Sequence, residues 1–253
     1  MKRSTSNNLI AYLIGIILLV GLWQVSSSLI GEETMVFPGP ISVFAHAWKL
    51  LGREYTYRCI LSSMGRMLTG FVISLLLGVF LGVFAGNSSW IERILAPGIT
   101  ALRAIPTASL IYLFIVLAGF KAAPMLLVVL VCFPIIYEGM AGGIRSVEKE
   151  LIDAAESDGA TLLQENLRIR IPLALPYLLV AMTSAFSLCF KIEIMAEVIT
   201  GASIPGLGSA IAGVRASDPT NMVPVFAYSL IAVILMLLID LIGMSIRNKT
   251  DLI

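Results

Sequence analysis

The sequence predicts an all-α membrane protein with about six transmembrane helices, and its composition is the first reason. Of its 253 residues, 58% are hydrophobic and 13% are charged, and the mean hydropathy is +0.95. Soluble domains are roughly 45–50% apolar and roughly 25% charged, because they need a polar surface. Lipid must therefore surround most of this chain. Each crossing takes about 20 apolar residues, so six crossings use roughly 120 residues and leave the rest for loops.

The first apolar run, residues 9–30, predicts a retained transmembrane helix. It is longer than the roughly 7–15 residues of a signal-peptide core and ends without a clear A-x-A cleavage site. The residues that follow are polar, contain Pro38-Gly39-Pro40 and include an amphipathic segment at 41–51. Residues 1–57 are therefore expected to form one transmembrane helix and an external loop that carries a surface helix.

Five further apolar segments predict the other spans, which form a membrane core at residues 58–248. A cytoplasmic tail is expected at residues 249–253. Pro106 and Pro134 interrupt two of these spans, and membrane helices tolerate such breaks where neighbours satisfy the freed backbone groups. The expected spans are residues 66–86, 104–120, 124–143, 172–198 and 222–246.

The second span carries glycines at four-residue intervals, at Gly78, Gly82 and Gly86. In a helix this spacing places three positions without side chains on one face. Such a face lets another helix approach closely. We therefore expect these three glycines to serve helix packing.

The Lys and Arg residues indicate how the chain is oriented. An even number of spans puts both termini on one side, and placing that side in the cytoplasm gives it the larger share of Lys and Arg, including Lys2 and Arg3. The long charged segment at residues 144–170 then becomes a cytoplasmic loop. The protein is expected to be multi-pass, with its N- and C-termini in the cytoplasm.

Within that loop, the residues predict a short helix, a turn and a second helix that leads to Pro172. Gly159 stands where a helix of about ten residues would end in a left-handed cap. Ala154 and Ala155 leave a shallow surface against which a partner can pack, and the acidic residues around them offer ion pairs at its rim.

The same loop carries a family resemblance. D-A-A-x-x-x-G at Asp153–Gly159, followed after nine residues by I-x-I-P, resembles the E-A-A-x-x-x-G…I-x-L-P signature of the membrane subunits of ATP-binding-cassette (ABC) importers. The resemblance covers about residues 36–248. Within the family, the chain is similar to the sulfonate/taurine/nitrate-type branch. Other matching runs are Phe37-Pro38-Gly39-Pro40, R-M-L-T-G-F from Arg66, L-R-A-I-P from Leu102, Phe133-Pro134-Ile135 and Gly206-Leu207-Gly208.

The resemblance implies a type I ABC importer permease fold in a bacterial plasma (inner) membrane. It implies that a coupling helix docks on a cytoplasmic ATPase subunit, which would hold ATP and Mg²⁺. An extracytoplasmic solute-binding protein would deliver a small, anionic solute, and a second permease copy would complete a homodimer. No cofactor is expected in this chain, which lacks the G-x-x-x-x-G-K-[ST] phosphate loop. The coupling residues would be Asp153, Ala154, Ala155, Glu156 and Gly159, with Asp153 replacing the family's glutamate.

Ionisable residues inside the expected spans are candidates for a substrate path. Lys191, Glu193 and Glu197 lie in the fifth span, where each charge costs at least about 2.5 kcal/mol and so needs a cavity or a partner. Glu193 and Glu197 share a helix face, whereas Lys191 lies roughly 120° around the helix from Glu197 and is expected to have a separate partner. These groups either line a path that favours an anion, or form buried ion pairs with Lys191 snorkelling outward. Asp240 is expected at the membrane interface.

Other functional classes fit the sequence less well. The 17 Lys and Arg residues nearly balance 16 Asp and Glu residues, so no basic surface for nucleic acid is expected. An ion-coupled secondary transporter shares the composition, but gives no reason for the D-A-A-x-x-x-G loop. A membrane hydrolase needs a nucleophile and a base, yet the only histidine, His46, lies in the external segment. Neither catalytic residues nor a metal site are expected, and Cys59, Cys132 and Cys189 are interpreted as packing residues.

Overall fold

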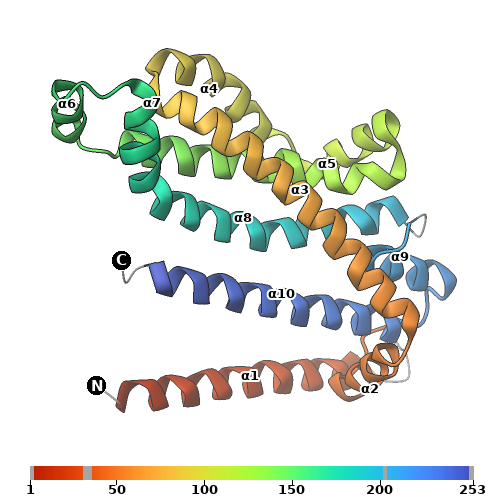
Figure 1. The fold of residues 1–253 in the computed structure, drawn as a ribbon. Coiled ribbons are helices and arrows are strands. Elements are labelled where there is room, and N and C mark those ends of the chain that lie inside the picture. Colours follow the sequence, from red (N-terminus) through yellow and green to blue (C-terminus); the bar gives the residue numbers. More distant parts are fainter. Residues whose placement is uncertain (1–2, 31–35, 202–203, 251–253) are drawn as a thin grey trace.

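A computed structural model describes residues 3–30, 36–201 and 204–250. Lys2, the tail residues 251–253 and the loop residues 31–35 and 202–203 lie outside the described residues. The predicted all-α class is confirmed by a chain of helices, with a π-helical segment at Asn166–Arg170 (Figure 1). The helices are α1 (Arg3–Ile30), α2 (Pro40–Leu51), α3 (Glu54–Asn87), α4 (Ser89–Ala104), α5 (Thr107–Arg145), α6 (Lys149–Ser157), α7 (Leu162–Glu165), α8 (Ile171–Thr200), α9 (Leu207–Ser217) and α10 (Val223–Thr250).

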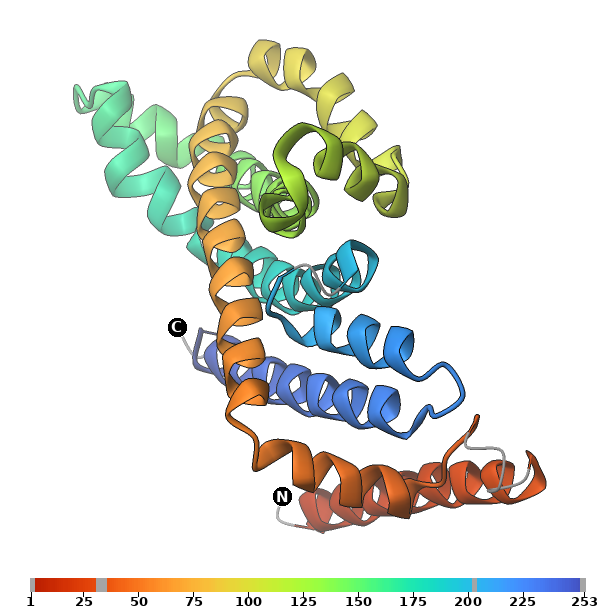
Figure 2. The ribbon, with the colours of Figure 1, turned by 90° about the vertical axis from the view of Figure 1, so that its right-hand side faces the viewer.

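The long helices form a stack that α3 crosses diagonally. Both views show the order α1, α10, α8, α5 and α4, with α3 running from α2 at one end to α4 at the other (Figures 1 and 2). Figure 1 also shows the two termini and α6 at the same end of the molecule, with α2 and α9 at the opposite end. This arrangement agrees with the expectation that the termini and the charged loop share one side.

Among the residues that the structure describes, four helices are long and apolar enough to cross a membrane: Glu54–Asn87, Thr107–Arg145, the continuous segment Leu162–Thr200, and Val223–Leu241. A shorter apolar helix lies at Ile14–Ile30. Apart from residues 104–106, the expected spans 104–120 and 124–143 fall together in α5, which has a non-helical break at Gly119 with a φ of 78°. A left-handed residue interrupts a right-handed helix, and glycine adopts it readily because it has no Cβ.

The structure adds one long helix that no expected span contains. α4 begins after Ser88, whose side chain accepts a hydrogen bond from the Ile91 N–H, and it contains Pro97. It ends before Pro106, where Ile105 is extended. A residue before proline disfavours the helical conformation, which explains the boundary. The expected third span at 104–120 is thus preceded by a separate helix.

The small residues of α5 and α3 let three helices pack closely. A Cβ added at Gly78 would lie 2.8 Å from Ile136 of α5, and one at Gly82 would lie 2.7 Å from Met140. One added at Gly86 would lie 2.5 Å from Ile144. On the other side of α5, a Cβ added at Gly143 would lie 2.8 Å from Ala174 of α8. Since real Cβ atoms almost never approach so closely, these positions need glycine for the α3–α5–α8 contact.

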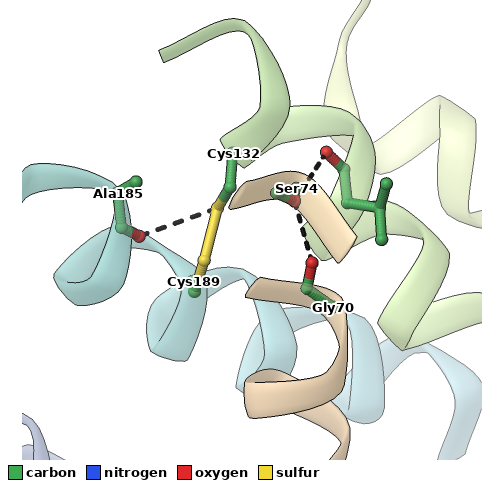
Figure 3. Close-up of a disulfide and its surroundings, with 6 residues drawn as sticks. Gly70, Ser74, Cys132, Ala185 and Cys189 are labelled. Atoms are coloured by element: carbon green, nitrogen blue, oxygen red, sulfur yellow. Dashed lines mark hydrogen bonds between the residues drawn. A yellow bond between two sulfur atoms is a disulfide. The ribbon is translucent and has the colours of Figure 1, made fainter. Parts of the chain in front are cut away.

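The interpretation of the cysteines as packing residues is wrong for two of them. Cys132 of α5 and Cys189 of α8 form a disulfide with a Cα–Cα distance of 6.6 Å, close to Ser74 of α3 (Figure 3). Cys59 is a buried free thiol, as a packing residue should be. The sequence alone could not predict this disulfide, because the two cysteines are 57 residues apart and only the packing of α5 on α8 brings them together.

Candidate functional site

The first candidate site is α6, which stands away from the helix stack (Figure 1). Ile152 is its buried residue, whereas Asp153, Ala154 and Glu156 are exposed and Ala155 is half-buried. The two small side chains lie between acidic ones on a surface that the rest of this chain leaves open. This is a shallow, charged-rimmed surface of the kind that a partner protein can cover.

Gly159 ends this helix as the sequence predicts. Its φ is 80°, and its N–H donates to the Glu156 carbonyl at 2.9 Å. The N–H of Ala160 donates to the Ala155 carbonyl at 3.0 Å, so the turn satisfies carbonyls at the helix end. Thr161 then starts α7 with a capping box to Gln164. The predicted helix, left-handed turn and second helix are confirmed.

One polar contact joins this loop to α3, and a second holds the end of the loop where α8 begins. The Asn87 Nδ2 at the end of α3 donates to the Asn166 Oδ1 at 2.7 Å. The Arg170 Nη2, at the start of α8, lies 3.5 Å from the Glu165 Oε2, and Glu165 is buried. The segment after α6 is thus joined to α3 through Asn166 and to α8 through the continuous chain.

The second candidate site is a buried charge cluster at the other end of α3 and α8. The Arg66 Nε donates to the Glu193 Oε1 at 2.8 Å, and its Nη2 donates to Glu197 and, at 2.8 Å, to the Pro205 carbonyl. The side chains of Glu193 and Glu197 are 0% exposed and that of Arg66 is 15% exposed. Charged groups so deep in a membrane helix need such partners, and each carboxylate has one.

The same cluster holds the start of α9. The Gly208 N–H donates to the Glu197 Oε2 at 2.8 Å, and the Leu207 N–H donates to the Ser63 Oγ at 2.9 Å. A carboxylate at a helix N-terminus is favoured by the free N–H groups and by the helix dipole. A Cβ added at Gly206 would lie 2.5 Å from the Glu197 Cδ, so the G-L-G run permits this close approach.

The geometry separates the three candidate path residues. Glu193 and Glu197 share a face, as expected, and both contact Arg66, so their contacts favour a structural role over contact with a solute. Lys191 is exposed, and among the described residues it makes no ion pair, so its expected partner is not found. Asp240, which is expected at the membrane interface, is half-buried and accepts a hydrogen bond from Ser187 of α8.

The role of Arg66 was not predicted from the sequence. One feature of the sequence could have indicated it. Arg66 is a cation in one apolar span, and Glu193 and Glu197 are two carboxylates in another span that need a partner. Their pairing depends on where α3 and α8 meet, and Arg66 and Glu193 are 127 positions apart in the sequence.

A family model described as binding-protein-dependent transport system inner membrane component matches residues 61–250. The chain belongs to this family. A protein of Escherichia coli (strain K12), provisionally named an aliphatic sulfonates transport permease protein, is 32% identical over 82% of this chain and 78% of its own length. The riboflavin transport system permease protein of Chloroflexus aurantiacus is 28% identical over 92% of this chain and 86% of its own length.

The fold also matches a solved structure. The chain aligns with a crystal structure of an amino acid ABC transporter with histidines at a TM-score of 0.64 and 17% identity, over 77% of this chain and 94% of that one. The similarity shows the type I importer permease fold. The protein is thus an inner-membrane, multi-pass permease subunit of a binding-protein-dependent ABC transporter, and it is not itself the ATPase. Family membership overturns the alternative of an ion-coupled secondary transporter.

Proposed function

We propose that this permease imports a small organic anion, of the alkanesulfonate type, that an extracytoplasmic solute-binding protein delivers. The observation that carries the solute class is the 32% identity to the relative named for aliphatic sulfonates. The riboflavin relative shows that similar chains serve other solutes, so the solute must be tested directly. Lys191 is retained as a candidate path residue, because it is an exposed cation on α8.

The energy for import would come from a cytoplasmic ATPase that docks on α6. The proposed contact residues are Asp153, Ala154, Ala155 and Glu156, with Gly159 fixing the turn that orients them. ATP and Mg²⁺ would bind in the ATPase, and this chain would carry no cofactor. Two permease copies would form a homodimer within the lipid, since a closed twofold assembly offers one α6 to each of two ATPase subunits.

In the proposed topology, the chain crosses the membrane six times. The crossings are α1, α3, α4 together with α5 up to Gly119, the rest of α5, α8 and α10. Both termini and α6 then face the cytoplasm, while α2 and α9 lie outside.

Thiol labelling tests this orientation. Ser157 and Ser217 are exposed at opposite ends of the molecule, and Cys59, Cys132 and Cys189 are each 0% exposed, so native cysteines should give little background. A membrane-impermeant maleimide should label Ser217→Cys in intact cells and label Ser157→Cys only after permeabilisation. Labelling in the reverse order would mean that the proposed orientation is inverted.

The function is tested on the complex recovered by gentle detergent purification. An ATPase and a solute-binding protein should co-purify with the permease, and 1-butanesulfonate should stimulate ATP hydrolysis in reconstituted vesicles. Riboflavin and glycine betaine serve as matched solutes without a net negative charge. Stimulation by either of these and none by the sulfonate would refute the proposed solute class.

A further inference from the structure

A cavity of about 610 Å³, broadly open on its outer side, lies between α3 and α5, beside the buried charge cluster. Apolar side chains form most of its wall, and its polar groups are two cationic side chains and two hydroxyls. Its lining residues are Leu61, Ser62, Gly65, Arg66, Thr69, Ala118, Lys121, Ala122 and Met125.

Lys121 supplies the uncompensated charge of this cavity. Arg66 is already paired with Glu193 and Glu197, whereas Lys121 makes no ion pair with any residue that the structure describes. The ammonium side chain is exposed and lies two residues after the break at Gly119. An anion that enters the cavity would thus meet a free cation within largely apolar walls, where charge interactions are less screened than in water.

The hydroxyl of Ser62 adds a donor. Its Oγ accepts a hydrogen bond from the Arg66 Nη1 at 2.8 Å, and this is the one bond found for the Ser62 side chain in the described part of the chain. The hydroxyl hydrogen is therefore available to an acceptor. The Thr69 hydroxyl, by contrast, donates to the Gly65 carbonyl at 2.8 Å.

The cavity also has room for an apolar group. A Cβ added at Gly65 would meet nothing within 4 Å, so the helix face there borders open space. Leu61, Ala118 and Met125 form the surrounding apolar wall. An anionic head with a short apolar tail would place each part against a matching surface.

We propose that this cavity binds an amphipathic anion, with the head at Lys121 and Ser62 and the tail against Leu61, Ala118 and Met125. The proposal rests on the proposed function in taking an alkanesulfonate as the ligand. A membrane lipid with an anionic headgroup has the same chemistry, and the test distinguishes the two sources.

The test measures binding of 1-butanesulfonate to the purified complex by equilibrium dialysis. Lys121→Gln should weaken binding by about tenfold or more, because a charge-assisted contact is lost. Lys49→Gln removes another exposed lysine, on α2, and should leave the affinity within about twofold. Absent binding to the wild type, or equal affinity in Lys121→Gln, would overturn the proposal.

A second pair of variants tests the space at Gly65. Gly65→Leu should intrude on the space for the apolar tail and weaken binding strongly, whereas Gly65→Ala should retain it, and thermal unfolding checks that both variants remain folded. Retained affinity in a folded Gly65→Leu would place the ligand elsewhere and overturn the proposal.

A third measurement separates the ligand sources and the proposed function. Phosphatidylglycerol that displaces the sulfonate in a Lys121-dependent way, where phosphatidylcholine does not, would support the anion site with lipid as its occupant. Binding at Lys121 without sulfonate-stimulated ATP hydrolysis would likewise support the site, while the proposed function alone would fail.

Discussion

Replacing Arg66 by methionine should cost about 3–5 kcal/mol of stability, because Glu193 and Glu197 would lose their shared cation while remaining buried. Methionine keeps much of the side-chain volume but offers no donor to either carboxylate. The start of α9, which bonds to Glu197, should also loosen. Thermal unfolding of the detergent-solubilised complex, together with the yield of folded protein, measures the effect.

Two comparisons show whether the loss comes from the buried charges. Arg58→Met removes an ion pair between Arg58 and Glu54, whose side chains are 70% and 78% exposed respectively. This variant should lose only about 0–1 kcal/mol of stability. Adding Glu193→Gln and Glu197→Gln to Arg66→Met should recover part of the stability, since no uncompensated charge remains. Equal losses in Arg58→Met and Arg66→Met would contradict the assigned role of the cluster.

Replacing Gly159 by valine should reduce uptake by roughly tenfold or more while the protein still inserts in the membrane. The residue has a φ of 80°, where a β-branched side chain is strained by about 1–3 kcal/mol. The turn after α6 should shift to relieve this strain, and the docking surface should shift with it. Solute uptake and solute-stimulated ATP hydrolysis in reconstituted vesicles report the loss.

Gly159→Asn is the matched control, because asparagine tolerates the left-handed conformation better than other residues with a Cβ. It should keep most of the uptake. An added Cβ at this position meets nothing within 4 Å, so the difference between the two variants reflects backbone conformation and not crowding. Wild-type uptake and ATP hydrolysis in Gly159→Val would show that this turn does not position the coupling helix.

The sequence predicted the features that depend on contiguous residues. A membrane helix needs a run of about 20 apolar residues, so the expected spans 66–86, 172–198 and 222–246 coincide, to within one residue at position 222, with parts of α3, α8 and α10. The turn at Gly159 was predictable for a similar reason, because a single residue type accepts a positive φ at a helix end. Periodicity also placed Glu193 and Glu197 on one face before their partner was known.

The tertiary structure decided which distant residues meet. Arg66 lies 127 residues before Glu193, and Cys132 lies 57 residues before Cys189. Hydropathy and helical period describe one element at a time, whereas these pairs depend on how α3, α5 and α8 cross. The cavity at Lys121 has the same origin, because the break at Gly119 and the packing of α5 on α3 place that lysine beside Arg66. Local sequence patterns were therefore enough to predict the helices and the turn at Gly159. The packing of α3 against α8 decided which cation pairs with the buried carboxylates, because those residues meet only in the folded chain.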